Sequence, residues 1–322
     1  MTQSVETTPG PLSSQAITYQ SVGGPDVIKI MARTVRPPAA GEVRLTVKAA
    51  AVNPTDVLLR DPGYGNPSFP LTPGMDAAGI IESVGPGVTH LRVGDEVMAG
   101  LTPLRPDGGA QAAHLVVPAA SVVPIPRGAS LAQASTLPMN GLTALLALEL
   151  AALRPGQTLA VSGGAGLLAH YAIAAAKSQG LTVIADAKPE EAALVRSYGA
   201  DFVVARGAGF NEAIRQEFPA GVDALLDTAL LAEQSFPAIR DGGVYLPVRG
   251  WGDAPSERGI RIKPVMVSDV LERTEWLDLL RNLVESGAIT LRVTGEYAPE
   301  QVADAQRALM AGGLRGRPVI VF

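Results

Sequence analysis

The sequence contains no cysteine among its 322 residues, so disulfides, thiolate nucleophiles and cysteine-ligated metal ions are excluded. It also lacks an excess of positive charge, because 26 Lys and Arg residues stand against 31 Asp and Glu residues. This balance predicts neither nucleic acid nor an anionic membrane as a partner. No stretch approaches the roughly 18 uncharged apolar residues of a membrane span. The first residues lack the apolar core of a secretory signal, and we expect a soluble, cytoplasmic protein.

Glycine and proline are abundant, and their placement in the first 130 residues indicates turns between short strands. The length suits about two domains, and hydrophobic residues, at 47%, suffice for a large core. In the first 130 residues, Gly and Pro recur every few positions around short β-branched runs, at 43–47, 79–84 and 115–117. Such punctuation predicts a strand-rich, partly barrel-like domain. The first fifteen or so residues are expected to form a loose polar tail.

The pattern changes near Ala129. An Ala- and Leu-rich helical stretch covers 131–153, with expected interruptions at Pro138 and Gly141. Apolar strand candidates then alternate with helical segments, which predicts an α/β fold with a doubly wound parallel sheet of six strands. The expected strands are 158–162, 182–186, 202–205, 222–226, 244–248 and 261–267, and the expected helices include 167–178, 189–198 and 233–239.

The last fifty residues exceed what a six-stranded nucleotide domain needs. They contain helical patterns over 271–286 and 301–311, a β-type piece over 289–294 and a terminal strand over 318–322. We therefore expect residues 1–128 to form a catalytic domain, residues 129–270 a dinucleotide-binding domain, and residues 271–322 to return to the catalytic domain.

A glycine-rich turn is the strongest chemical motif. Gly164, Gly166 and Ala169 form G-x-G-x-x-A after an expected strand and before an expected helix. Small residues there permit a tight turn and close approach of a pyrophosphate to the helix N-terminus. The context favours dinucleotide binding over a merely structural helix start. The expected contacts are Gly164, Ala165, Gly166, Leu167 and Leu168.

The choice between NADH and NADPH depends on the strand ends. Asp186 ends the second expected strand and could accept from a ribose 2′-OH, whereas Lys188 and Arg206 could neutralise a 2′-phosphate. Alternatively, both cations are solvated surface residues. Strand alternation sends Asp186 and Ala187 to opposite faces, and we hypothesise that Ala187 faces the ribose. The sequence therefore favours NADPH over NADH.

Five motifs carry a resemblance to a known family: AAVNPTD at 50–56, PGMDAAG at 73–79, VGDEV at 93–97, LPMNGLTA at 137–144 and GGAGLLA at 163–169. From about residue 15 to residue 322, the chain resembles the medium-chain dehydrogenase/reductase superfamily, specifically its zinc-independent quinone oxidoreductase branch. The resemblance implies a six-stranded Rossmann sheet, a β-rich, partly barrel-like (GroES-like) catalytic domain and a homodimer.

Departures from the zinc-containing relatives bear on the chemistry. Asn53 and Met75 stand near the positions of the family's metal-binding Cys and His residues. The three histidines, His90, His114 and His170, lie far apart without ligand spacing. We therefore expect no metal site.

The resemblance also implies roles for individual residues. Asn53 and Tyr64 match positions whose side chains face the nicotinamide and the substrate. The Asn53 amide would then orient the substrate or the nicotinamide, and the Tyr64 phenol would donate a hydrogen bond or a proton to the substrate carbonyl. Thr143 matches a position beside the nicotinamide, and Val248 and Arg249 match backbone that meets the carboxamide or substrate. The alternatives are a loop-capping role for Asn53, an exposed loop aromatic for Tyr64 and helix packing for Thr143.

Without a metal, an alkoxide is hard to stabilise, whereas hydride addition to an enone or quinone delocalises charge onto an oxygen that hydrogen bonds can hold. The expected activity is hydride transfer from NADPH to a small quinone or α,β-unsaturated carbonyl compound. An enoyl-thioester reductase and a non-catalytic sensor that binds pyridine nucleotides remain alternatives.

Overall fold

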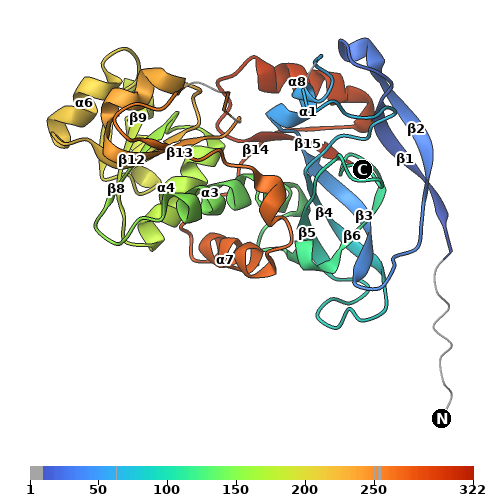
Figure 1. The fold of residues 1–322 in the computed structure, drawn as a ribbon. Helices are drawn as coiled ribbons and strands as arrows, with labels where there is room; N and C mark the ends of the chain where they lie inside the picture. Colours follow the sequence, from blue (N-terminus) through green and yellow to red (C-terminus); the bar gives the residue numbers. More distant parts are fainter. Residues whose placement is uncertain (1–9, 63, 250, 253–254) are drawn as a thin grey trace. The chain divides into compact units, whose positions relative to one another are not determined.

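A computed structural model of the chain describes residues 10–62, 64–249, 251–252 and 255–322 (Figure 1). The chain divides into two compact units. The first comprises the chain up to Met139 with Leu271–Asp278 and Leu291–Phe322, and the second comprises Asn140–Val270 with Leu279–Thr290. Residues 279–290, expected with the catalytic domain, thus group with the second unit. Within the described ranges, no helix has the length and apolar character that crossing a membrane requires.

The second unit is built on a parallel sheet with the strand order β10-β9-β8-β11-β12-β13. Its central strands are almost wholly buried apolar runs, as expected when helices cover both faces of a sheet. The predicted doubly wound α/β fold is confirmed. The strands are β8 (Thr158–Ser162), β9 (Thr182–Ala187), β10 (Phe202–Ala205), β11 (Val222–Asp227), β12 (Ile239–Pro247) and β13 (Arg261–Ile262).

Eight α-helices lie within the described residues, and most match the sequence pattern. They are α1 (Pro54–Leu58), α2 (Leu131–Ala134), α3 (Pro138–Ala151), α4 (Leu167–Ser178), α5 (Ala192–Ser197), α6 (Phe210–Glu217), α7 (Thr274–Glu285) and α8 (Val302–Met310). Six short 3₁₀ helices join them: η1 (Pro25–Val27), η2 (Ala119–Ser121), η3 (Pro189–Glu191), η4 (Ala232–Ala238), η5 (Val267–Val270) and η6 (Pro299–Gln301).

Four details of the second unit differ from the pattern. The pattern predicts a break at Gly141, but α3 runs through it, because a Cβ there would lie 2.5 Å from Leu280 and glycine permits this close helix packing. The expected helix 233–239 is the 3₁₀ helix η4, which contains Pro237. The expected strand 261–267 shortens to the two residues of β13, and β12 begins at Ile239 rather than at residue 244.

The first unit is β-rich, as predicted. Seven of its strands form one sheet, in which β3 pairs with β4 along one edge and with β6 and β15 along the other. The C-terminal strand β15 lies between β14 and β3 (Figure 1). These strands are β3 (Glu42–Ala51), β4 (Asp76–Val84), β5 (Glu96–Gly100), β6 (His114–Pro118), β7 (Val122–Pro124), β14 (Val293–Tyr297) and β15 (Arg317–Val321).

A separate antiparallel pair precedes this sheet. It consists of β1 (Leu12–Tyr19) and β2 (Ile28–Val35), in register from Leu12 opposite Val35 to Tyr19 opposite Ile28. The expectation of a loose tail over the first fifteen residues is therefore wrong from Leu12 onward, because the last four residues of that segment pair with β2. Residues 1–9 lie outside the described residues.

Candidate functional site

The glycine-rich turn joins the carboxyl end of β8 to the start of α4. Gly163 has a φ of 70°, and a Cβ on Gly164 would lie 2.5 Å from the Asp186 carbonyl oxygen, so both positions require glycine. Gly166 is the N-cap residue of α4, and a Cβ there would approach only the Gly163 carbonyl oxygen, at 3.2 Å. The first N–H groups of a helix have no intrahelical acceptors, so this turn can hold an anion such as a pyrophosphate.

Asp186 lies directly against this turn. Its carboxylate accepts a hydrogen bond from the Gly164 N–H at 3.0 Å, and its second oxygen is 3.9 Å from Arg206 Nε. Burial raises the pKa of Asp186, while the Gly164 N–H and the Arg206 charge oppose that rise. That Ala187 faces the ribose stays a prediction, but the Asp186 carboxylate is not turned away from the glycine turn.

The structure brings the two expected phosphate-binding cations to one sheet edge. Ala187 in β9 pairs with Ala205 in β10, and Lys188 and Arg206 follow these residues directly. Both cations are exposed, with Arg206 donating its backbone N–H to the Ala187 carbonyl. Their position at the same sheet edge is therefore a consequence of strand register.

The other expected cofactor contacts have different environments. Ala165 and Leu167 are buried and Leu168 is half-buried at the start of α4. Thr143 is a buried residue of α3. Val248 is half-buried and Arg249 exposed directly after β12.

Asp227 is a residue that sequence reasoning missed. It ends β11, and its carboxylate accepts from Ser162 Oγ at 2.6 Å and from the Tyr245 hydroxyl at 2.7 Å, which ties the ends of β8 and β12 to β11. Burial and this carboxylate together raise the pKa of Tyr245. In the sequence, the sign of Asp227's role is one acidic residue at the end of an apolar strand. Asp227 thereby stiffens the strand end from which the glycine turn departs.

In the first unit, Asn53 is fixed by buried polar partners. It is the N-cap residue of α1, and its backbone N–H donates to the Asp56 carboxylate at 2.8 Å. Its side-chain amide donates to Asp76 at 2.7 Å and accepts from Arg317 Nε at 2.9 Å. Strand register explains the contact between Asn53 and Arg317. Val319 of β15 pairs with Ala51 of β3, which brings Arg317 opposite Asn53.

Two carboxyl groups in this cluster have strongly shifted acidity. Burial raises the pKa of Asp56 and that of Asp76 to about 7 each. Hydrogen bonds from the Gly74 N–H to Asp56 and from the Met139 N–H to Asp76 oppose the rise. Arg317 also favours the ionised forms, while the charge of Asp76 raises the pKa of Asp56 further. The cluster therefore changes charge near neutral pH.

Tyr64 has a different setting. It is an exposed loop residue after α1, and its backbone N–H donates to the Asp61 carbonyl at 3.3 Å. Asn53, by contrast, is completely buried. The structure thus places one expected catalytic side chain in a buried network and leaves the other accessible.

Comparisons with known proteins agree with the fold. Residues 39–127 match the alcohol dehydrogenase GroES-like domain, and residues 198–320 match the zinc-binding dehydrogenase family. The chain is 30% identical to an alcohol dehydrogenase of Geobacillus stearothermophilus over 87% of this chain and 92% of that protein. A crystal structure of an alcohol dehydrogenase superfamily protein from Novosphingobium aromaticivorans superposes with a TM-score of 0.86 at 26% identity, covering 96% of this chain and 99% of the other.

Two further relatives indicate which branch of the dehydrogenases the chain is similar to. The chain is 29% identical to the NADPH-dependent alkenal/one oxidoreductase, chloroplastic, of Arabidopsis thaliana, over 96% of this chain and 80% of that protein. It is 28% identical to the quinone oxidoreductase of Mus musculus, over 96% and 98%. The chain therefore belongs to the medium-chain dehydrogenase/reductase superfamily, whose members use nicotinamide cofactors. Within that superfamily it is an oxidoreductase of the quinone oxidoreductase branch.

Zinc, which the name of one matched family implies, does not fit the residues present. Zinc in proteins takes Cys, His and carboxylate ligands, and the sequence has no cysteine. The described part of the chain contains no group of three His, Asp or Glu residues placed to hold a metal ion. The Asn53 side-chain oxygen already accepts from the guanidinium of Arg317.

We predict that the purified protein contains far less than one equivalent of zinc and that a chelator leaves its turnover unchanged. The reason is the missing ligand set, and elemental analysis of the active protein checks it. A zinc alcohol dehydrogenase treated in parallel serves as the positive control for the chelator. Stoichiometric zinc whose removal abolishes turnover would contradict the prediction.

Proposed function

We propose that the protein is an NADPH-dependent reductase that transfers hydride to a quinone or an α,β-unsaturated carbonyl compound without zinc. The observation that carries this proposal is the turn between β8 and α4, whose glycines leave the helix N-terminus open to a pyrophosphate. The alkenal/one and quinone oxidoreductase relatives support the substrate class.

In this proposal the nicotinamide supplies the hydride when the cofactor is bound. The turn Gly164–Leu168 holds the pyrophosphate through the backbone N–H groups of Leu167 and Leu168 at the start of α4, and Thr143 with the backbone at Val248 and Arg249 orients the nicotinamide. The substrate oxygen gains negative charge as hydride adds to the carbon chain, so a hydrogen-bond donor must stabilise it. The accessible phenol of Tyr64 supplies that donor.

Asn53 has a second, orienting role in the proposal. Its amide is held between Asp76 and Arg317, so its orientation is fixed before any substrate arrives. Such fixed dipoles stabilise developing charge without reorganising during the reaction. We therefore assign Tyr64 the donor role and Asn53 the role of a preorganised amide.

The test is a substrate panel followed by the absorbance of NADPH. We expect oxidation with quinones and enones, little with saturated ketones, and a fall in kcat for Tyr64→Phe. Faster turnover of enoyl thioesters than of free enones would favour an enoyl-thioester reductase. Tight NADPH binding without turnover of any acceptor would instead favour a nucleotide sensor.

Cofactor choice yields a separate prediction. Arg206 lies 3.9 Å from Asp186 and offsets a carboxylate that would otherwise repel a 2′-phosphate. Replacing Lys188 and Arg206 together by Ala should therefore weaken NADPH binding about 10- to 100-fold, since the two exposed charge-assisted contacts together contribute roughly 1.5–3 kcal/mol. NADH binding should change little. Fluorescence titration with both cofactors measures the difference.

The matched control removes a cation from the opposite sheet edge. Arg154 is exposed and precedes β8, so Arg154→Ala should leave both affinities unchanged. Equal losses for NADPH and NADH in the double variant, or a wild-type preference for NADH, would assign the ribose contact to Asp186 instead.

A further inference from the structure

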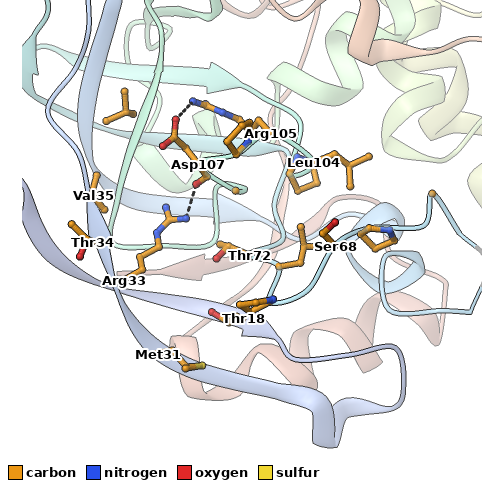
Figure 2. A pocket seen from close by; sticks show the side chains of 18 of the residues that line it. Thr18, Met31, Arg33, Thr34, Val35, Ser68, Thr72, Leu104, Arg105 and Asp107 are labelled. Atoms are coloured by element: carbon orange, nitrogen blue, oxygen red, sulfur yellow. Dashed lines mark hydrogen bonds and ion pairs between the residues drawn. The ribbon is translucent and has the colours of Figure 1, made fainter.

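The first unit contains a cavity of about 660 Å³ that the proposed reaction does not use. Its walls come from residues 31–35 of β2, from residues between 65 and 72 after α1, and from residues 103–108 between β5 and β6 (Figure 2). No residue assigned above to substrate or cofactor is among the described residues that line it. The cavity is therefore a candidate for a second small-molecule site.

The cavity wall carries more positive than negative charge. The Arg33 guanidinium donates to the backbone oxygen of Asp107 at 2.7 Å, and Arg105 donates to the Asp107 carboxylate at 3.1 Å (Figure 2). The same carboxylate accepts from Arg36 at 2.8 Å, and Arg36 also pairs with Glu42. Arg36 and Arg105 thus share the carboxylates of Asp107 and Glu42, whereas Arg33 bonds only to carbonyl oxygens. One positive charge remains unbalanced.

Two of these guanidinium groups also have unused donors. Arg33 Nε and Arg105 Nη1 are buried, and neither has a hydrogen-bond partner among the described residues. Buried N–H groups in proteins are nearly always bonded, and an unbonded charged one is costly. Burial lowers the pKa of both guanidinium groups, yet arginine stays charged in proteins. An oxygen acceptor from outside the chain, reached by small shifts of these side chains, would satisfy both.

The rest of the wall mixes polar and apolar side chains, and its hydroxyl groups come from Thr18, Thr34, Ser68 and Thr72. The exposed residue Leu104, together with Val35 and Leu71, supplies apolar side chains to the lining. Prolines at 67, 70, 103 and 106 also line the cavity. Because proline has no backbone N–H, these positions offer a ligand no backbone hydrogen-bond donor. The apolar part of this wall suits a small hydrocarbon group on a ligand whose anionic group meets the arginines.

We propose that this cavity binds a small organic acid, a carboxylate with an apolar body, whose charge pairs with Arg105 and Arg33. A single carboxylate matches the single unbalanced charge, and its two oxygens match the fork of a guanidinium group. The volume lies within the range of small-molecule sites. This site goes beyond the proposed reductase activity and does not depend on it.

Isothermal titration calorimetry of the full chain with phenylacetate and its neutral analogue phenylacetamide tests the proposal. We expect phenylacetate to bind at least about tenfold more tightly than the amide, because only the acid makes charge-assisted bonds. Arg105→Met should remove that preference while leaving amide binding unchanged. Arg92→Met, which removes an exposed cation of the same unit outside the cavity, should change neither affinity.

Leu104→Ala provides a second variant that is safe for folding, because the side chain is exposed. It should weaken acid and amide equally. Equal binding of acid and amide to the unmodified protein, or an undiminished acid preference in Arg105→Met, would overturn the proposal. Inorganic phosphate that binds as tightly as phenylacetate would also overturn it, and so would loss of phenylacetate binding at saturating NADPH. Because these measurements report binding alone, they are independent of whether the reductase assay succeeds.

Discussion

Gly166→Val should weaken binding of the nicotinamide cofactor about 100-fold while leaving the fold nearly intact. A branched side chain at this N-cap would occupy the space in front of the first N–H groups of α4 and remove about two charge-assisted hydrogen bonds, roughly 3 kcal/mol together. The backbone tolerates a side chain there, because φ is −69° and the nearest atom to an added Cβ is 3.2 Å away. Fluorescence titration measures the affinity and thermal unfolding measures the stability.

Gly164→Val is the matched contrast. An added Cβ would lie 2.5 Å from the Asp186 carbonyl oxygen and 2.9 Å from the Ala185 side chain, so this variant should lose stability as well as affinity. If Gly166→Val instead kept wild-type affinity, the pyrophosphate would have to bind away from this turn.

The second large effect is a loss of stability as the pH rises from 5 to 8. Asp56 and Asp76 have a pKa of about 7 in the folded chain, against 3.8 when unfolded. The folded state therefore holds more protons in this interval, and stability present below pH 4 is lost as the pH rises through 7. One such carboxyl contributes roughly 2 kcal/mol between pH 5 and 7, or about 3 °C in Tm.

Asp56→Asn should flatten this profile. The Gln111 side-chain oxygen is buried without a described partner. After a small rotation of the Gln111 amide, this oxygen can accept a hydrogen bond from the asparagine side chain introduced at position 56, or from a protonated Asp56 in the wild type. His114 opposes the trend only weakly, because burial lowers its pKa and its contribution to stability rises with pH up to 6.5. Thermal unfolding at fixed ionic strength across this interval gives the comparison. A Tm that rises from pH 5 to 8 in the wild type would refute a buried, protonated pair.

Local patterns predicted much of the second unit. The strands β8 and β10 and the helix α4 have the expected boundaries, because each is a short apolar run or an Ala-rich stretch with its own turn residues. The glycine turn was also predictable, since its signal lies within seven consecutive residues. Where tertiary packing decides, as for Gly141 against Leu280, propensity alone predicted a break that does not occur.

The polar networks were not predictable in the same way. Asn53 meets Arg317 across 264 positions of sequence, and Ser162 meets Asp227 across 65. Such pairs depend on strand register between distant segments, which no local period encodes. The two arginines of the cavity, Arg33 and Arg105, come from different loops and strands and have no shared motif. Asp76 and Asp227 gave only the general signal of an acid within or beside a buried strand.

The place of β15 between β14 and β3 has a consequence for biosynthesis. The ribosome releases the residues of the second unit, 140–270, long before it releases Arg317–Val321. Domains generally fold as units during synthesis, so the nascent chain can complete its nucleotide-binding sheet while Ala49–Ala51 of β3 still lack their partner strand and Asn53 still lacks Arg317. The first unit, which is translated first, is therefore the last to complete its fold. An unpaired strand edge of this kind is what chaperones shield on growing chains.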